Sequence, residues 1–204
     1  LQKFMSTNLL KRLYSPLISS EDVFAFDQDY ERQTLEELLS KESKIVVLGE
    51  PGVGKTFELM GLFDSLWEEK EAKDSVPFFI SLRKYHGSFK FEDLIPYQNW
   101  KELSSVTFIL DGLDETAYPH DFISVLDVFI NKYINKNLKF IISSRTNIYL
   151  NNQLNLDSFK PYKLEALDLD EINIIIANEG IVGVEINQAF IDRHPFYTNP
   201  FFLI

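Results

Sequence analysis

The sequence predicts an α/β fold in which helices cover both faces of a central parallel sheet of five strands, followed by the start of a small helical domain. Short apolar stretches alternate along the chain with segments of helical periodicity, an alternation that is typical of a parallel sheet. Several stretches are apolar at every position, which indicates strands that are buried on both faces. The five expected strands cover residues 45–48, 76–82, 106–110, 140–143 and 162–164.

Apolar residues at helical spacing predict the helices. The main segments cover residues 32–40, 59–67, 122–133, 171–178 and 186–194. Residues 84–104 are irregular, with short helices expected at 91–95 and around Trp100. Near the start of the chain, the leucines of residues 8–14 predict a short helix that ends before Pro16, because the residue before a proline disfavours helical geometry.

These elements divide the chain into three parts. We expect an N-terminal arm or linker at residues 1–27, an α/β core at 28–166 and a truncated helical subdomain at 167–204. The sequence begins with leucine and ends in an apolar run without a stop signal. We therefore expect it to be a piece of a longer protein.

The composition excludes several classes of protein. With 204 residues, of which 45% are hydrophobic and 25% charged, the chain is long enough to bury a full core. No apolar run approaches the roughly 20 residues of a membrane-spanning helix, so we expect no membrane contact. The net charge of −11 makes direct nucleic-acid binding unexpected, because such binding uses clustered Lys and Arg. The absence of cysteine excludes disulfides and thiolate metal sites and fits the cytoplasm, where we expect the protein.

A glycine-rich segment between the first strand and the following helix predicts a phosphate-binding loop. Residues 49–56 read Gly-Glu-Pro-Gly-Val-Gly-Lys-Thr, which is the spacing G-x-x-x-x-G-K-[ST] in its required context. Backbone N–H groups of such a loop surround phosphates, and the helix N-terminus adds partial positive charge. The alternative is an ordinary glycine-rich turn. The predicted nucleotide-binding residues are Gly49, Glu50, Pro51, Gly52, Val53, Gly54, Lys55, Thr56 and Phe57.

Two oxygen ligands for Mg²⁺ are predicted at this edge of the sheet. The Thr56 hydroxyl follows Lys55, which we expect to reach the terminal phosphates. Asp111 follows the apolar strand 106–110, where an ionised carboxylate is unfavourable without a cation. In nucleotide-binding folds the metal-binding acid ends a neighbouring strand. The alternative for Asp111 is a capping residue in a turn.

Three further residues complete the predicted site. Asp114 is the first candidate for the acid that orients or deprotonates the attacking water, and Glu115 is the close second. The alternative is that one of these acids caps the next turn while the other is solvated. Arg145 follows the fourth strand, so its guanidinium is expected at the same edge. There it can pair with phosphate oxygens and sense the γ-phosphate. The alternative for Arg145 is a surface ion pair.

Other nucleotide-binding classes fit the sequence less well. A GTPase is expected to read its base with Asn-Lys-x-Asp, and the Asn-Lys pairs at 131–132 and 135–136 lack that aspartate. The Gln loop and Ser-Gly-Gly signature of transport ATPases are absent. The strand 76–82 lies between the phosphate-binding loop and Asp111 in the sequence. This favours the division of nucleotide-binding folds whose ATPases have an extra strand at that place. An interaction module that binds nucleotide without hydrolysing it is a further alternative. Lys55 and Asp111 do not distinguish it from an ATPase, because it would keep both residues.

The motifs together resemble the NACHT group of the STAND class of P-loop ATPases. The resemblance rests on residues 49–56 (Walker A), on Phe-Ile-Leu-Asp-Gly-Leu-Asp-Glu at 108–115 (Walker B) and on Ile-Ile-Ser-Ser-Arg at 141–145. The NACHT pattern has a small residue after the metal-binding Asp and acids three and four positions on, as here. Residues 198–203 resemble a proline motif of the next domain, which implies that Pro200 packs against adenine. The sequence Asn199-Pro200-Phe201 departs from the Gly-x-Pro-Leu form of many members.

The resemblance implies a signalling switch that binds ATP or ADP with Mg²⁺ and prefers adenine to guanine. Family members rest closed with ADP, exchange it for ATP on activation, self-associate through this domain and hydrolyse ATP slowly. Bacterial members serve in defence against phage. The effector and sensor domains that the family implies would lie outside this sequence.

Overall fold

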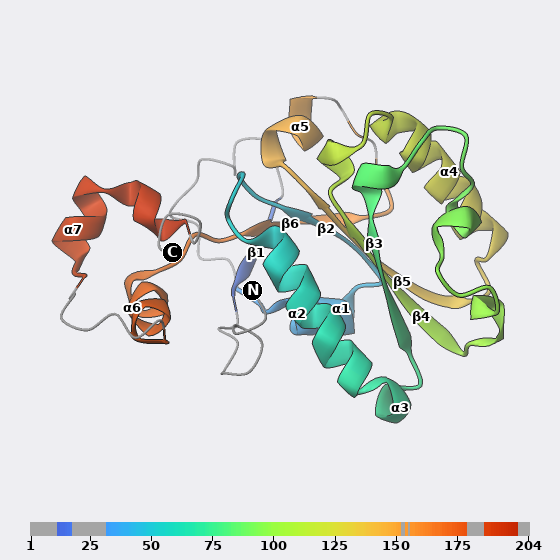
Figure 1. The fold of residues 1–204 in the computed structure, drawn as a ribbon, viewed down its shortest axis with the longest axis horizontal. Helices are drawn as coiled ribbons and strands as arrows, with labels where there is room; N and C mark the ends of the chain where they lie inside the picture. Colours follow the sequence, from blue (N-terminus) through green and yellow to red (C-terminus); the bar gives the residue numbers. More distant parts are fainter. Residues whose placement is uncertain (1–11, 18–31, 152–153, 155, 179–185, 200–204) are drawn as a thin grey trace.

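A twisted six-stranded sheet forms the centre of the computed structural model, which describes residues 12–17, 32–151, 154, 156–178 and 186–199 (Figure 1). The strand order is β1-β6-β2-β5-β4-β3, and only the β1–β6 pair is antiparallel. The strands are β1 (Tyr14–Pro16), β2 (Lys44–Leu48), β3 (Val76–Ser81), β4 (Ser105–Asp111), β5 (Asn137–Ser144) and β6 (Lys160–Leu164). The predicted parallel sheet of five strands is confirmed, and β1 is added to its edge.

Each of the five main helical segments that the sequence predicts contains a helix. The helices are α1 (Leu35–Lys41), α2 (Lys55–Glu68), α3 (Lys70–Lys73), α4 (Pro119–Lys132), α5 (Thr146–Asn151), α6 (Leu169–Asn178) and α7 (Gln188–Arg193). Thr34 and Glu37 form a capping box that starts α1, and Pro119 opens α4, where its missing N–H is not needed. In the part of the chain that is described, no helix has the length and apolar character that crossing a membrane requires.

The prediction of a helix through residues 8–14 is wrong at its C-terminal end. Tyr14 begins β1, while residues 8–11 lie outside the described part of the chain. The backbone of Tyr14 exchanges hydrogen bonds of 2.9 and 3.1 Å with Gln33, and the Tyr14 ring is fully buried. Pairing with β6 and Gln33 satisfies the backbone on both sides of this segment, which an isolated helical turn would not do.

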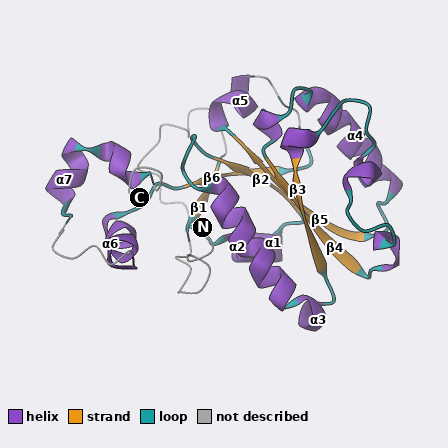
Figure 2. Cartoon of the chain, in the orientation of Figure 1, coloured by secondary structure: helices purple, strands orange, loops and turns teal. Residues whose placement is uncertain are grey.

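Alternating side chains of β2 enter two separate cores on opposite faces of the sheet. Ile45 and Val47 pack with α1 and α2, whereas Val46 and Leu48 pack with α4 and the 3₁₀ segments. Figure 2 shows these helices on either side of the strands. The sheet is therefore buried on both faces, as its unbroken apolar strands predict.

A third cluster of buried side chains holds α6 and α7 together. This part of the chain contains no strand among its described residues and lies beside the sheet in Figure 1. The cluster consists of Leu167, Ile172, Ile176, Ile186 and Ile191. The exact domain boundaries that the sequence suggests stay predictions.

The sheet order places the end of β2 at a topological switch point. β6 lies on one side of β2 and β5 on the other, and ligands of open α/β sheets bind where the order reverses in this way. β5 also separates β2 from β4. Residues at the carboxyl end of β5 therefore stand between the loop that follows β2 and Asp111 at the end of β4.

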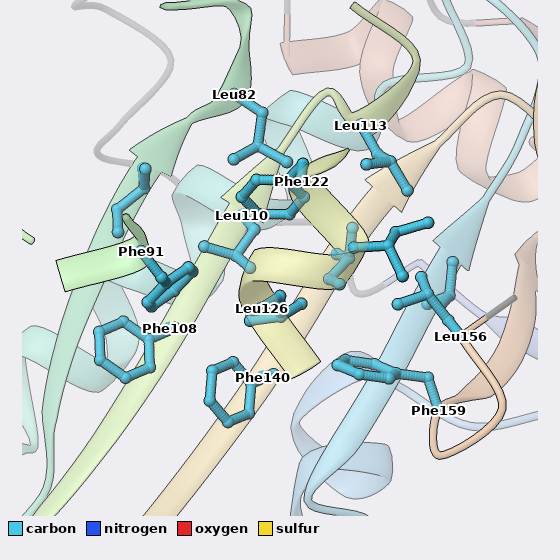
Figure 3. Close-up of a cluster of buried hydrophobic side chains, with 14 of the residues drawn as sticks. Leu82, Phe91, Phe108, Leu110, Leu113, Phe122, Leu126, Phe140, Leu156 and Phe159 are labelled. Carbon is cyan, nitrogen blue, oxygen red and sulfur yellow. The ribbon is translucent and has the colours of Figure 1, made fainter. Parts of the chain in front are cut away.

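An aromatic cluster anchors the irregular segment between β3 and β4 to the sheet. Phe91 begins the 3₁₀ helix η3 (Phe91–Leu94) and is fully buried. Its ring centroid lies 4.4 Å from that of Phe129, 5.3 Å from that of Phe108 and 6.2 Å from that of Phe140. Figure 3 shows Phe91 beside Phe108 within this cluster.

We expect Phe91→Ala to lower the free energy of unfolding by about 3–5 kcal/mol, because it opens a cavity among rings that cannot close it. The measurement is urea denaturation followed by circular dichroism. Phe89→Ala is the matched control, since Phe89 is 39% exposed and its loss should stay within about 0.5 kcal/mol. Similar losses in the two variants would contradict the assignment of Phe91 to the core.

Candidate functional site

Two glycines in left-handed conformation shape the loop between β2 and α2. Gly52 has φ +80° and Gly54 has φ +99°, values that glycine adopts without strain. Gly54 is the N-cap of α2, so the free N–H groups of the first helical turn begin directly after it. A Cβ on Gly49 would lie 2.8 Å from Cγ1 of Val53. The spacing of the glycines therefore reflects both backbone conformation and close packing.

Lys55 lies against the carbonyl groups of this loop. Its Nζ donates to the carbonyl oxygen of Gly49 at 2.7 Å and to that of Glu50 at 3.1 Å. Burial lowers the pKa of Lys55 below its ordinary value, while the charge of Asp114 opposes this shift. An anion in the loop would compete with the two carbonyls for the ammonium group, and a partly desolvated cation favours that exchange.

Asp111 is held on both of its oxygens. Thr56 Oγ1 donates to Asp111 Oδ2 at 2.9 Å, and Ser143 Oγ donates to Oδ1 at 2.6 Å. The backbone N–H of Gly112 donates to Ser143 Oγ at 2.8 Å. The structure thus brings the two predicted metal ligands into contact. Ser143, which the sequence did not single out, fixes the carboxylate from the intervening strand β5.

The oxygen atoms of Thr56 and Asp111 fit a Mg²⁺ site. Magnesium commonly binds one or two protein oxygens together with substrate phosphates and several waters. No cluster of three or more His or acidic side chains suited to a metal occurs among the described residues. A hydroxyl and a carboxylate beside a phosphate loop therefore match Mg²⁺ held partly by phosphate, rather than a cage built by the protein alone.

Asp114 and Arg145 form a two-point contact at the same edge of the sheet. Arg145 Nε lies 2.9 Å from Asp114 Oδ2, and the backbone N–H of Arg145 donates to Oδ1 at 3.0 Å. The Asp114 side chain is 6% exposed, whereas that of Arg145 is 46% exposed. Both carboxylate oxygens of Asp114 are thus engaged, while the guanidinium keeps an open side.

Glu115 pairs with an arginine that the sequence analysis missed. Arg83 lies in the 3₁₀ helix η2 (Leu82–Lys84) just after β3, and its Nε is 2.9 Å from Glu115 Oε2. The side chains are 73% and 35% exposed respectively, so solvent weakens this pair. The one signal in the sequence was the position of Arg83 at the carboxyl end of a strand.

Phe57 and Pro200 are the other residues that the sequence assigned to nucleotide binding. Phe57 is exposed on α2, and Pro200 lies outside the described residues. Its neighbour Asn199 donates from Nδ2 to the carbonyl oxygen of Pro51 at 3.1 Å. The end of the helical segment therefore contacts the loop directly through a residue that the sequence did not assign to the site.

A second residue that the sequence did not assign to the site, Arg12, also contacts the loop. Arg12 is 4% exposed and donates from Nη1 to the carbonyl oxygen of Val53 at 3.1 Å, and from Nη2 to the carbonyl oxygen of Glu165. Its Nε has no hydrogen-bond partner in the described part of the chain. Burial raises the pKa of nearby Glu58 to about 7, and the charge of Arg12 opposes that rise.

Comparison with known families identifies this arrangement. A family model described as the NACHT domain matches residues 43–179, which is more than half of the chain. The chain belongs to the NACHT family. The match includes the loop, Asp111 and its neighbouring acids, and Arg145, so the resemblance seen in the sequence motifs is confirmed.

One solved structure with a TM-score above 0.5 supports the fold of this NACHT chain. The Hsp104–ADP complex of S. cerevisiae is 15% identical with a TM-score of 0.51, and the match covers 78% of this chain and 26% of that one. Cdc6p of Pyrobaculum aerophilum is 17% identical with a TM-score of 0.47, covering 82% of this chain and 53% of that one. The chain spans less than two thirds of either protein. No curated protein matches it.

We expect Ser143→Ala to lower the free energy of unfolding by about 1–3 kcal/mol, because the buried N–H of Gly112 loses its acceptor and Asp111 loses a donor. Ser144→Ala is the control on the same strand, since the hydrogen bond of the Ser144 hydroxyl among the described residues is a long one, 3.4 Å to the carbonyl oxygen of Arg145. Urea denaturation should show a smaller loss for Ser144→Ala. Equal losses would mean that the Asp111 contact contributes nothing specific.

Proposed function

We propose that this NACHT domain binds ATP or ADP with Mg²⁺ and acts as the nucleotide switch of a longer signalling ATPase of the STAND class. The observation that carries the proposal is the 2.9 Å contact between Thr56 and Asp111 beside the loop that holds Lys55. These three groups supply the hydroxyl, the carboxylate and the cation that Mg²⁺ and terminal phosphates require. Hydrolysis in such a switch is slow and regulatory.

The proposed roles follow from the position of each side chain. The loop N–H groups and Lys55 bind the β- and γ-phosphates, and Thr56 and Asp111 hold the metal. Bound Mg²⁺ would neutralise charge on the phosphate oxygens. Pro200, next to the loop contact of Asn199, packs against adenine in this proposal, and this contact favours adenine over guanine.

Arg145 supplies the difference between the two nucleotide states. Its guanidinium is paired with Asp114 on one side and exposed on the other, so a γ-phosphate can attract it. A contact made only with ATP shifts the equilibrium between domain arrangements. Each tenfold preference requires about 1.4 kcal/mol, which is within the range of one charge-assisted hydrogen bond.

The contacts of the two acids favour Glu115 as the residue that faces the attacking water. Asp114 is nearly buried and holds Arg145 with both oxygens. Glu115 is more exposed, and its partner Arg83 is a surface residue whose pairing is easily broken. This order reverses the one that the sequence suggested, in which Asp114 came first.

A second candidate function is a nucleotide-binding interaction module without turnover. The observation in its favour is that both candidate acids are paired with arginines. In either case we propose that the domain works in the cytoplasm with effector and sensor domains and self-associates on activation. A role in bacterial defence against phage is part of the proposal and comes from the family.

We expect Lys55→Ala to abolish binding of ATP and ADP, because it removes the cation that faces the terminal phosphates. Isothermal titration calorimetry with Mg²⁺ present measures the loss. Lys84→Ala removes an exposed lysine at the end of η2 and should bind like the wild type. Unchanged nucleotide affinity in Lys55→Ala would refute the site.

We expect Glu115→Gln to reduce ATP turnover about 100-fold with little change in ATP affinity, the effect of losing a general base. Asp114→Asn should instead reduce the preference for ATP over ADP, because Arg145 loses its anchor. Phosphate release and calorimetry separate the two effects. If Asp114→Asn alone stops turnover, Asp114 is the base. If the wild-type protein binds ATP but has no turnover, the interaction module is favoured.

A further inference from the structure

The carbonyl group of Val53 occupies a special place in the phosphate loop. Val53 stands between Gly52 and Gly54, both in left-handed conformation. Within the loop, its N–H reaches the carbonyl oxygen of Glu50 at 3.3 Å, and its side chain is buried in the core beneath α2. Glycines on both sides leave the backbone free to rotate, so the direction of this carbonyl depends on an external partner.

Arg12 is that partner. Its guanidinium donates to the carbonyl oxygen of Val53 and to that of Glu165 just after β6. A buried guanidinium is unfavourable unless it is hydrogen-bonded and near negative charge. Glu58 on α2 and Glu171 on α6 lie close enough to interact with Arg12 electrostatically, which makes the position tolerable for a cation.

Fixing the carbonyl of Val53 also fixes the N–H of Gly54. In a trans peptide, the C=O of one residue and the N–H of the next point in opposite directions, and the chain has no cis peptide bond among its described residues. When Arg12 holds the carbonyl oxygen on its own side, the N–H of Gly54 is directed away from Arg12. That N–H belongs to the nest of donors that a phosphate loop requires.

We infer that Arg12 is a positioning residue of the phosphate loop, and that through it the docking of strand β1 sets the affinity for nucleotide phosphate. The inference rests on the proposed function for its ligand. Arg12 lies two residues before Tyr14, the first residue of β1, and the carbonyl oxygen of Leu13 accepts a 3.0 Å bond from the N–H of Glu165. The N-terminal segment, the end of β6 and the loop are therefore tied by one side chain.

The coupling works in both directions. Displacement of β1 would remove the donor from Val53 and leave the loop less ordered, which weakens phosphate binding. Nucleotide binding, in turn, stabilises the docked position of β1 by the same factor, as linkage requires. A segment that precedes the nucleotide-binding core in the sequence thus senses the state of the loop through Arg12.

The test combines nucleotide affinity with hydrogen exchange of the loop. Arg12→Gln should weaken ATP and ADP binding about tenfold, the effect of one charge-assisted hydrogen bond, and should speed amide exchange in a peptide covering residues 49–58. Arg12→Lys should lie between Arg12→Gln and the wild type, because it keeps the charge but not the planar fork. Should Arg12→Gln fail to fold, Arg12→Lys alone must show both effects.

Arg32→Gln is the matched control, because it removes an exposed arginine by the same substitution and leaves Arg12 in place. It should leave nucleotide affinity and loop exchange near wild-type values. Wild-type affinity and exchange in Arg12→Gln, or equal effects in Arg32→Gln, would overturn the inference. If wild-type protein binds no nucleotide, the proposed function fails, and loop exchange in the Arg12 variants still decides whether Arg12 orders the loop.

Discussion

Hydrogen bonds from Thr56 and Ser143 hold both oxygens of Asp111, and the whole edge of the sheet is arranged so that these three residues can meet. The contact requires β5 to lie between β2 and β4, because only then does a residue of β5 stand between the loop and the acid. It also requires the left-handed glycines that start α2 at Lys55. The site at Asp111 therefore depends on both the order of the strands and the conformation of the loop.

The charges around Asp111 are organised as two ion pairs of different strength. Arg145 holds the nearly buried carboxylate of Asp114 through its backbone and its side chain, whereas Arg83 holds Glu115 in a contact open to solvent. Separating the first pair requires a competing anion, while water and salt weaken the second. The edge of the sheet thus combines one stable contact with one that changes easily.

The sequence predicts the elements whose signal is local and misses those that depend on tertiary contact. Continuous apolar stretches such as residues 45–48 and helical periodicity identify the five parallel strands and the longer helices, because burial repeats along the segment. β1 has three residues and pairs with β6, far away in the sequence. α5 has six residues, too few to establish a period.

The site shows the same division. Thr56 and Asp111 are predictable because their motifs need a fixed spacing and a strand beside them. The partners Arg12, Arg83 and Ser143 carry no such spacing. Each reaches the site because a strand ends or begins nearby in space, and only the strand order reveals which ends are neighbours. The sequence placed Asp114 before Glu115, but the exposure and pairing that distinguish the two acids in the structure carry no local sequence signal.

The two outer strands of the sheet each contain a proline, Pro16 in β1 and Pro77 in β3. A proline lacks the N–H that a further strand would need, so both borders resist extension by a strand of another molecule. Gln33 already bonds to the outer side of Tyr14. The two prolines and the Gln33 contact therefore disfavour edge-to-edge pairing between the sheets of two copies of this domain.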